Sequence, residues 1–133
     1  MWDEGGGAIE SIVIKQKIKR LAIDSISSFS SLFESEQEKR QEIISLFDMI
    51  RKWGCTSILT LQKDPFKSKS ESTTPTVEYQ ADSLILLYFI RVKNNRQRLI
   101  EILKMRGTNH STEMHFFRIQ KGIKVGKMAN LKL

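Results

Sequence analysis

Hydrophobic residues recur every three or four positions in two stretches of the chain, which is the spacing of an amphipathic helix. The first stretch covers residues 8–19 and follows three glycines, Gly5-Gly6-Gly7, that we expect to be flexible. The second covers residues 36–53 and begins after Ser35, which has capping-box spacing to a glutamate three positions later. Gly54 is well placed to end this second helix, because glycine readily adopts the left-handed conformation found at helix ends.

Short runs of apolar and β-branched residues predict strands on either side of the second helix. Leu21-Ala22-Ile23 ends on Asp24, and a serine-rich polar loop over residues 25–31 is expected to follow. The second run, residues 56–61, reads Thr-Ser-Ile-Leu-Thr-Leu, and Gln62 stands at its carboxyl end. The order strand, helix, strand favours a parallel sheet.

The second half of the chain predicts further strands after a long loop. Residues 63–80 are rich in Ser, Thr, Lys and Pro without periodicity, so we expect a mobile loop there. Residues 84–89 are apolar without alternation, which is typical of a strand covered on both faces, and we expect them at the centre of a parallel sheet. Residues 98–105 and 114–119, joined by a polar turn through 107–110, predict an antiparallel extension. The predicted fold class is α/β, with a mostly parallel sheet, helices and a C-terminal antiparallel hairpin.

The composition fits one soluble domain over residues 1–133, with 40% hydrophobic and 28% charged residues. The longest apolar run, Leu84 to Ile90, is too short to cross a bilayer, so we expect no membrane partner and a cytoplasmic location. The net charge is +7 and the isoelectric point is near 9.7. These values are compatible with a polyanionic partner such as nucleic acid, and equally with a merely solvated basic surface.

Asp24 is the first residue that could carry chemistry. An apolar strand that ends in Asp is how nucleotide-hydrolysing folds present a carboxylate to Mg²⁺, because the carboxyl ends of parallel strands open into the ligand crevice. The alternative interpretation is an Asp that only caps the turn or helix after the strand. The residues around Asp24 leave both interpretations open.

A string of basic, polar and glycine residues follows the predicted strand 98–103: Lys104-Met105-Arg106-Gly107-Thr108-Asn109-His110. Phe-x-Ile at 117–119 and Gly-Ile-x-Val at 122–125 come after it, and Ile-Asp-Ser at 23–25 lies far ahead. Together these blocks resemble the KaiC-like ATPases of the RecA and RadA superfamily. The resemblance covers about residues 18–125 and includes the order and spacing of all the blocks, which makes it far more specific than any one of them.

The resemblance implies a partial RecA-like domain that acts as a subunit of a ring or filament, with ATP and Mg²⁺ between neighbours. Asp24, at the Walker B position, would help to hold Mg²⁺ on its own subunit's nucleotide, and Ser25 would flank it. Gln62 matches the strand-end position of a polar sensor of the γ-phosphate.

The resemblance also implies a segment that reaches across the subunit interface to the neighbour's ATP: Lys104, Met105, Arg106, Thr108 and His110. Its positively charged side chains would contact that ATP in the manner of an arginine finger, with Arg106 as the strongest candidate. The alternation of a strand puts Lys104 and Arg106 on one face, so both can point at one anion. The other interpretation takes them as ordinary surface charges at a strand end.

The sequence departs from the family in one major respect, because it contains no Gly-x-x-x-x-Gly-Lys-Ser/Thr phosphate-binding loop. The family's acidic pair that activates water would also lie ahead of residue 1. ATP hydrolysis by this chain alone should therefore be negligible. The central strand that precedes such a loop is missing too, so we expect a rearranged sheet or an oligomer, formed with further copies or with a full-length homologue.

Two further functions are compatible with the same residues. In the first, the chain is a DNA-binding module, because RadA-like relatives contact DNA through the loop after the sensor strand, which here carries Lys63, Lys67 and Lys69. In the second, it is a regulatory subunit of a recombination-type assembly, which donates Lys104 and Arg106 to a partner's ATP site and binds no nucleotide itself.

Overall fold

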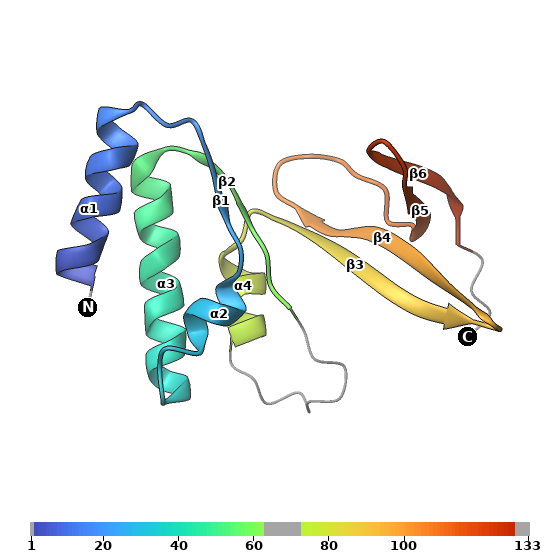
Figure 1. Cartoon of the computed structure of the whole chain (residues 1–133), viewed down its shortest axis with the longest axis horizontal. Coiled ribbons are helices and arrows are strands. Elements are labelled where there is room, and N and C mark those ends of the chain that lie inside the picture. The colour runs from blue at the N-terminus through green and yellow to red at the C-terminus, as the bar shows by residue number, and fades with distance from the viewer. Residues whose placement is uncertain (1, 63–72, 130–133) are drawn as a thin grey trace. The chain divides into compact units, whose positions relative to one another are not determined.

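The computed structural model describes residues 2–62 and 73–129 of the chain (Figure 1). They fall into two compact units, Met1–Gln80 and Ala81–Leu133. Within the described residues, no helix combines the length and the hydrophobicity needed to cross a bilayer.

The described residues of the first unit form two parallel strands and four helices: α1 (Trp2–Lys15), β1 (Arg20–Ile23), α2 (Ile26–Ser30), α3 (Glu36–Trp53), β2 (Thr56–Leu59) and α4 (Thr73–Gln80). The strands β1 and β2 pair in parallel, from Arg20 opposite Thr56 to Ile23 opposite Leu59. This pairing confirms the predicted order of strand, helix and parallel strand.

Helix α3 has the bounds that the sequence predicts, because both of its ends are capped by local groups. Ser35 Oγ accepts the backbone N–H of Glu38 at 3.1 Å, and Glu38 Oε2 accepts the backbone N–H of Ser35 at 3.3 Å. At the other end Gly54 has φ +64°, the left-handed conformation that stops a helix. These caps satisfy backbone groups that the helix itself cannot pair.

The core of the first unit forms around the apolar face of α3, which contacts α1, α2 and α4. Ile43 of α3 and Ile26 of α2 are fully buried. Val13 of α1 and Val77 of α4 are buried as well. The periodic hydrophobic residues of α3 therefore serve as the shared packing surface of this unit.

In the second unit, residues 81–129 form a four-stranded antiparallel sheet in the order β3 (Ser83–Val92), β4 (Asn95–Met105), β5 (His115–Ile119) and β6 (Ile123–Met128). The predicted pairing of residues 98–105 with 114–119 is confirmed, with Arg98 opposite Phe117 and Ile100 opposite His115. Strand β6, which the sequence did not predict as a strand, extends the sheet beyond β5. The molecule thus has the predicted α/β class, with a parallel pair and an antiparallel extension.

The prediction that residues 84–89 lie at the centre of a parallel sheet is wrong. In the described residues, β3 is an edge strand of the antiparallel sheet and pairs only with β4. Its exposure alternates, so Ile85, Leu87 and Phe89 are 53%, 65% and 56% exposed. The error has a physical cause: a continuous apolar run indicates that both faces can be buried, but it does not specify the neighbouring strand.

Three local predictions also differ from the structure. Helix α1 begins at Trp2 and ends at Lys15, so the expected flexible glycines at 5–7 lie within it. The predicted loop 25–31 contains the short helix α2, whose first turn is capped by the side chain of Ser25. The predicted loop 63–80 is shorter, because residues 73–80 form α4. Residues 63–72 lie outside the described part of the chain.

Candidate functional site

The carboxyl ends of β1 and β2 bring a carboxylate and a hydroxyl together. Asp24 directly follows β1, Thr60 directly follows β2, and Thr60 Oγ1 donates a hydrogen bond to Asp24 Oδ1 at 2.5 Å. Backbone bonds extend the parallel ladder past both strands, from Thr60 N–H to Ile23 O at 3.0 Å and from Ile26 N–H to Thr60 O at 2.9 Å. The Asp24–Ser25 peptide bond is cis. The Asp24 side chain is exposed, so its carboxylate is accessible to a ligand.

The first turn of α2 holds the segments that follow the two strands. Ser25 is the N-cap of α2, and its Oγ accepts the backbone N–H of Ser28 at 3.3 Å. Ser27 Oγ accepts the backbone N–H of Gln62 at 2.9 Å, and the same hydroxyl donates to the Gln62 carbonyl oxygen at 3.3 Å. The backbone of Gln62 is therefore fixed near the ends of both strands, while its side chain is exposed.

Sequence reasoning identified Asp24, Ser25 and Gln62 but missed Thr60 and Ser27. Both missed residues are hydroxyl side chains close to the end of a predicted strand, in a stretch where many serines and threonines offer no distinguishing pattern. Their role depends on hydrogen bonds between distant positions. Thr60 and Asp24 are 36 positions apart in the sequence, and Ser27 and Gln62 are 35 positions apart.

The strand-end cluster formed by Asp24, Ser25, Ser27, Thr60 and Gln62 supplies oxygen ligands and only one carboxylate. In residues 2–62 and 73–129, no group of three or more His, Cys, Asp or Glu side chains could hold a metal ion. One carboxylate fits Mg²⁺, which is commonly held by one or two carboxylates together with water and the phosphates of a nucleotide. The residues present therefore suit a metal that arrives with its nucleotide, not a metal caged by protein.

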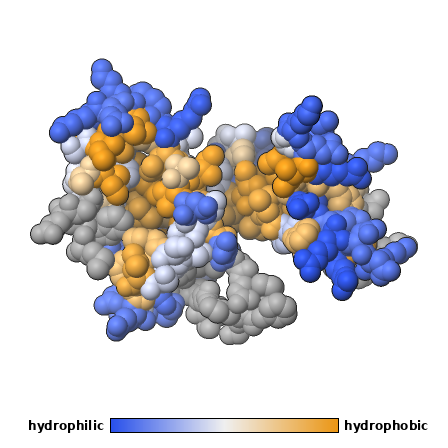
Figure 2. All heavy atoms as spheres, in the orientation of Figure 1, coloured by the Kyte–Doolittle hydropathy of each residue, from blue (hydrophilic) through white to orange (hydrophobic). Residues whose placement is uncertain are grey.

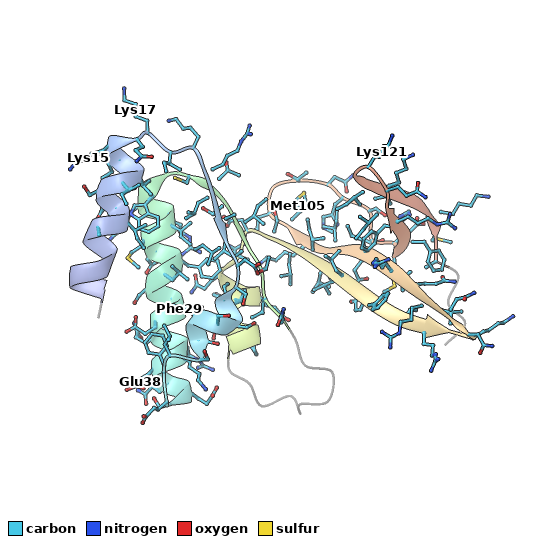
Figure 3. The ribbon with its side chains drawn as sticks, in the orientation of Figure 1. Lys15, Lys17, Phe29, Glu38, Met105 and Lys121 are labelled. Atoms are coloured by element: carbon cyan, nitrogen blue, oxygen red, sulfur yellow. The ribbon has the colours of Figure 1, made fainter. Side chains whose placement is uncertain are left out.

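The second group of predicted residues lies at the end of β4, where Figure 3 labels Met105. Lys104 pairs with Leu84 of β3, and Met105 is opposite Ser83. Arg106 follows the strand, and its backbone N–H donates to the carbonyl oxygen of Asp82 at 2.9 Å. Its guanidinium forms an ion pair with Asp82, with Nη1 at 3.2 Å from Oδ1.

The Arg106 ion pair is exposed, with 51% of the arginine side chain and 75% of the aspartate side chain accessible to solvent. Exposed pairs of this kind contribute only about 0–1 kcal/mol, because water competes for both charges. A stronger anion could therefore replace Asp82 at small cost.

A turn after Arg106 carries the remaining predicted residues. The backbone N–H of Thr108 donates to the carbonyl oxygen of Met105 at 3.3 Å, and Gly107 between them has φ +68°. His110 Nδ1 lies 3.0 Å from the carbonyl oxygen of Ser111. Local turn bonds thus fix the backbone between β4 and β5.

The two groups of predicted residues belong to different compact units, so their action on one nucleotide stays a prediction. The predicted DNA-contacting residues Lys63, Lys67 and Lys69 lie outside the described residues.

Comparison with known proteins places these motifs in a family context. A family model described as "ATPase: KaiC" matches residues 4–130. The circadian clock protein KaiC3 of Synechocystis is 30% identical over 128 residues, which cover 94% of this chain and 25% of that protein. The circadian clock oscillator protein KaiC of Thermostichus vulcanus is 27% identical over 126 residues, covering 94% of this chain and 24% of that protein.

A solved structure has the same fold. A KaiC-like protein from the hyperthermophilic archaeon Pyrococcus horikoshii OT3 matches with a TM-score of 0.75 and 32% sequence identity, over 90% of this chain and 51% of that chain. The chain thus spans about a quarter of the curated relatives it matches and about half of the archaeal protein.

Proposed function

The chain belongs to the KaiC family of ATPases, and from this premise we propose that it is the C-terminal half of a RecA-like ATP-binding domain that contributes to a nucleotide site shared between subunits. The observation that carries this proposal is the hydrogen bond from Thr60 to Asp24 at the adjoining carboxyl ends of two parallel strands. In α/β proteins this edge of the sheet is where ligands bind.

Asp24 acts as the carboxylate on the metal side of the nucleotide. Thr60 orients it, since the hydroxyl engages one carboxylate oxygen. Ser25 flanks the aspartate, and Gln62 senses the γ-phosphate with its exposed amide. Mg²⁺ supplies charge neutralisation of the phosphates when it is bound with ATP.

Lys104 and Arg106 act in trans, on ATP held by a neighbouring subunit, and Met105, Thr108 and His110 line the same contact. Negative charge spreads over the transferring phosphoryl oxygens, and a guanidinium brought into a dry site stabilises it. An arginine finger of this kind is worth about 10³ to 10⁵ in rate. The exposed pairing of Arg106 with Asp82 supports this role, because that ion pair can be exchanged for a phosphate.

ATP hydrolysis by this chain alone is negligible, because its sequence contains no phosphate-binding loop. Activity requires a partner that has one, either a full-length homologue or an oligomer that includes one. The unpaired edges of β2 and β3 in the described residues support association, since exposed strand edges readily pair with other chains.

The test uses a full-length KaiC homologue whose own finger arginine has been replaced. Adding the wild-type chain should restore ATP hydrolysis, and the Arg106→Ala chain should restore at least a hundredfold less. Arg118→Ala, which removes an arginine from β5 of the same sheet, is the matched control and should behave like wild type. Equal rates with the Arg106→Ala and wild-type chains would refute the role in trans.

A second candidate is the DNA-binding or regulatory subunit of a recombination-type assembly. The lysines at 63, 67 and 69 favour DNA contact by the segment after β2. Replacing these three lysines with glutamine should weaken binding to single-stranded DNA at low salt. Absence of binding at low salt would remove this candidate.

A further inference from the structure

The positive charge of the chain is concentrated in its second unit. Residues 81–133 contain 11 Lys and Arg residues but only 3 Asp and Glu residues, which gives a net charge of +8. Residues 1–80 contain 11 Lys and Arg residues and 12 Asp and Glu residues, which gives a net charge of −1. Together they give the +7 of the whole chain. Such asymmetry indicates that the antiparallel sheet, and not the helical unit, meets a polyanion.

The strands β3 and β4 gather part of this charge on one face, near their two-residue turn. Arg91 lies opposite Arg96, and Phe89 lies opposite Arg98. Because alternate residues of a strand share a face, these four side chains stand together on the same side of the hairpin. All four are exposed. We call them the arginine cluster. On the face seen in Figure 2, hydrophilic residues gather toward the turn end of this hairpin.

The cluster is organised around the Phe89 ring. The guanidinium carbon of Arg98 lies 5.0 Å from the ring centroid and that of Arg96 lies 5.3 Å from it. These cation–π contacts keep two guanidinium groups beside an aromatic ring that is 56% exposed. The result is a flat, positively charged surface on which a planar group can stack.

In the part of the chain that the structure describes, no carboxylate neutralises the arginines of this cluster. The sequence has no Asp or Glu between Asp82 and Glu101. Glu101 is three residues from Arg98, so it points to the opposite face, where it accepts a hydrogen bond from Tyr88. Among the described residues, no ion pair to Arg91, Arg96 or Arg98 is formed. Like charges directly opposite each other destabilise a sheet, so Arg91 and Arg96 favour an external anion between them.

We propose that the arginine cluster binds single-stranded nucleic acid. Guanidinium groups pair with phosphates through two parallel hydrogen bonds, and both guanidinium planes and phenylalanine rings stack on unpaired bases. An acidic peptide would use the charges but not the ring. The exposed Leu87 and Ile85 extend the same face toward the other end of β3 and offer apolar contact to further bases.

The experiment measures fluorescence anisotropy of labelled oligothymidine and oligouridine with the full 133-residue chain, in the absence of ATP, over a series of salt concentrations. Because neither nucleotide nor a partner protein is present, failure here does not bear on the proposed action on ATP. The triple variant Arg91→Gln/Arg96→Gln/Arg98→Gln should bind at least tenfold more weakly. Its slope of log affinity against log salt should fall by about 2, since each phosphate contact contributes about 0.7 for single strands.

Two comparisons make the result specific to the cluster. Lys121→Gln/Lys124→Gln/Lys127→Gln removes the same charge from the region of β6 and should cost less than threefold. Phe89→Leu keeps an apolar side chain but removes the ring, so it should weaken binding about fivefold to a hundredfold with an unchanged salt slope, as expected for the loss of one stacked base. Circular dichroism of each variant checks that the sheet is intact.

Four outcomes would overturn the proposal. The first is no binding at low salt, and the second is equal loss in the arginine and lysine triple variants, which would mean unspecific attraction. The third is competition by polyglutamate that matches competition by unlabelled oligonucleotide, which would identify an acidic protein as the partner. The fourth is loss of binding confined to the variant of Lys63, Lys67 and Lys69, which would place the contact in that segment.

Discussion

The contact between Tyr88 and Glu101 makes a quantitative prediction about the antiparallel sheet. The Tyr88 hydroxyl donates a hydrogen bond to Glu101 Oε1 across β3 and β4. Burial of the phenol, this hydrogen bond and the negative charge of Glu101 raise the pKa of Tyr88 from 10.0 to about 12. Replacing Glu101 with Gln removes the charge but keeps an acceptor. We expect the pKa of Tyr88 to fall but to stay above 10.0, because burial is the largest cause and remains.

The size of the effect follows from the two pKa values. At pH 11, a tyrosine with a pKa of 10.0 is about 90% phenolate, whereas one with a pKa of about 12 is about 10% phenolate. Near-ultraviolet absorbance of the phenolate measures this fraction directly. The chain has two tyrosines, so the titration uses a Tyr79→Phe background in which only Tyr88 remains. A Tyr88 that titrates near 10.0, or that titrates identically with and without Glu101→Gln, would refute the reasoning.

The same shift links stability to pH. Between pH 10 and pH 12 the unfolded chain loses the phenol proton while the folded chain keeps it, so the folded state binds more protons. The free energy of unfolding should therefore fall as pH rises through this window, and the contribution should be level below it. Denaturant unfolding of wild type and Tyr88→Phe isolates this contribution, because other groups titrate in both proteins. A difference between them that stays constant from pH 9 to pH 12 would contradict the linkage.

Two stability predictions concern the ends of α3. Gly54→Ala should lower the free energy of unfolding by about 1–2 kcal/mol, because φ is +64° there and a Cβ would meet no atom within 4 Å, so the cost is conformational only. Gly54→Asn, which tolerates that conformation, should cost less, and an equal loss would argue against this cause. Ser35→Ala should cost about 1 kcal/mol through loss of the N-cap, whereas Glu38→Gln retains a capping partner and should cost little. Urea denaturation midpoints measure all four variants.

Interactions between residues that are close in sequence made several features of this structure predictable without tertiary information. The bounds of α3 were predictable because Ser35, Glu38 and Gly54 satisfy the ends of the helix through local bonds. The hairpin of β4 and β5 was predictable from alternation and a polar turn, and the order of motifs around Asp24 and Arg106 was enough to indicate the family.

Only the tertiary structure decided which distant residues meet. The apolar run of β3 has the same composition whether it is covered on both faces or on one. In residues 2–62 and 73–129 it pairs only with β4, and Phe89 is exposed beside Arg96 and Arg98. Likewise, Thr60 reaches Asp24 because β1 and β2 pair in parallel and end at the same edge. Periodicity reports how one segment distributes its own polar and apolar groups. Contacts between segments depend on which other segments they pack against, and the local sequence pattern does not specify those partners.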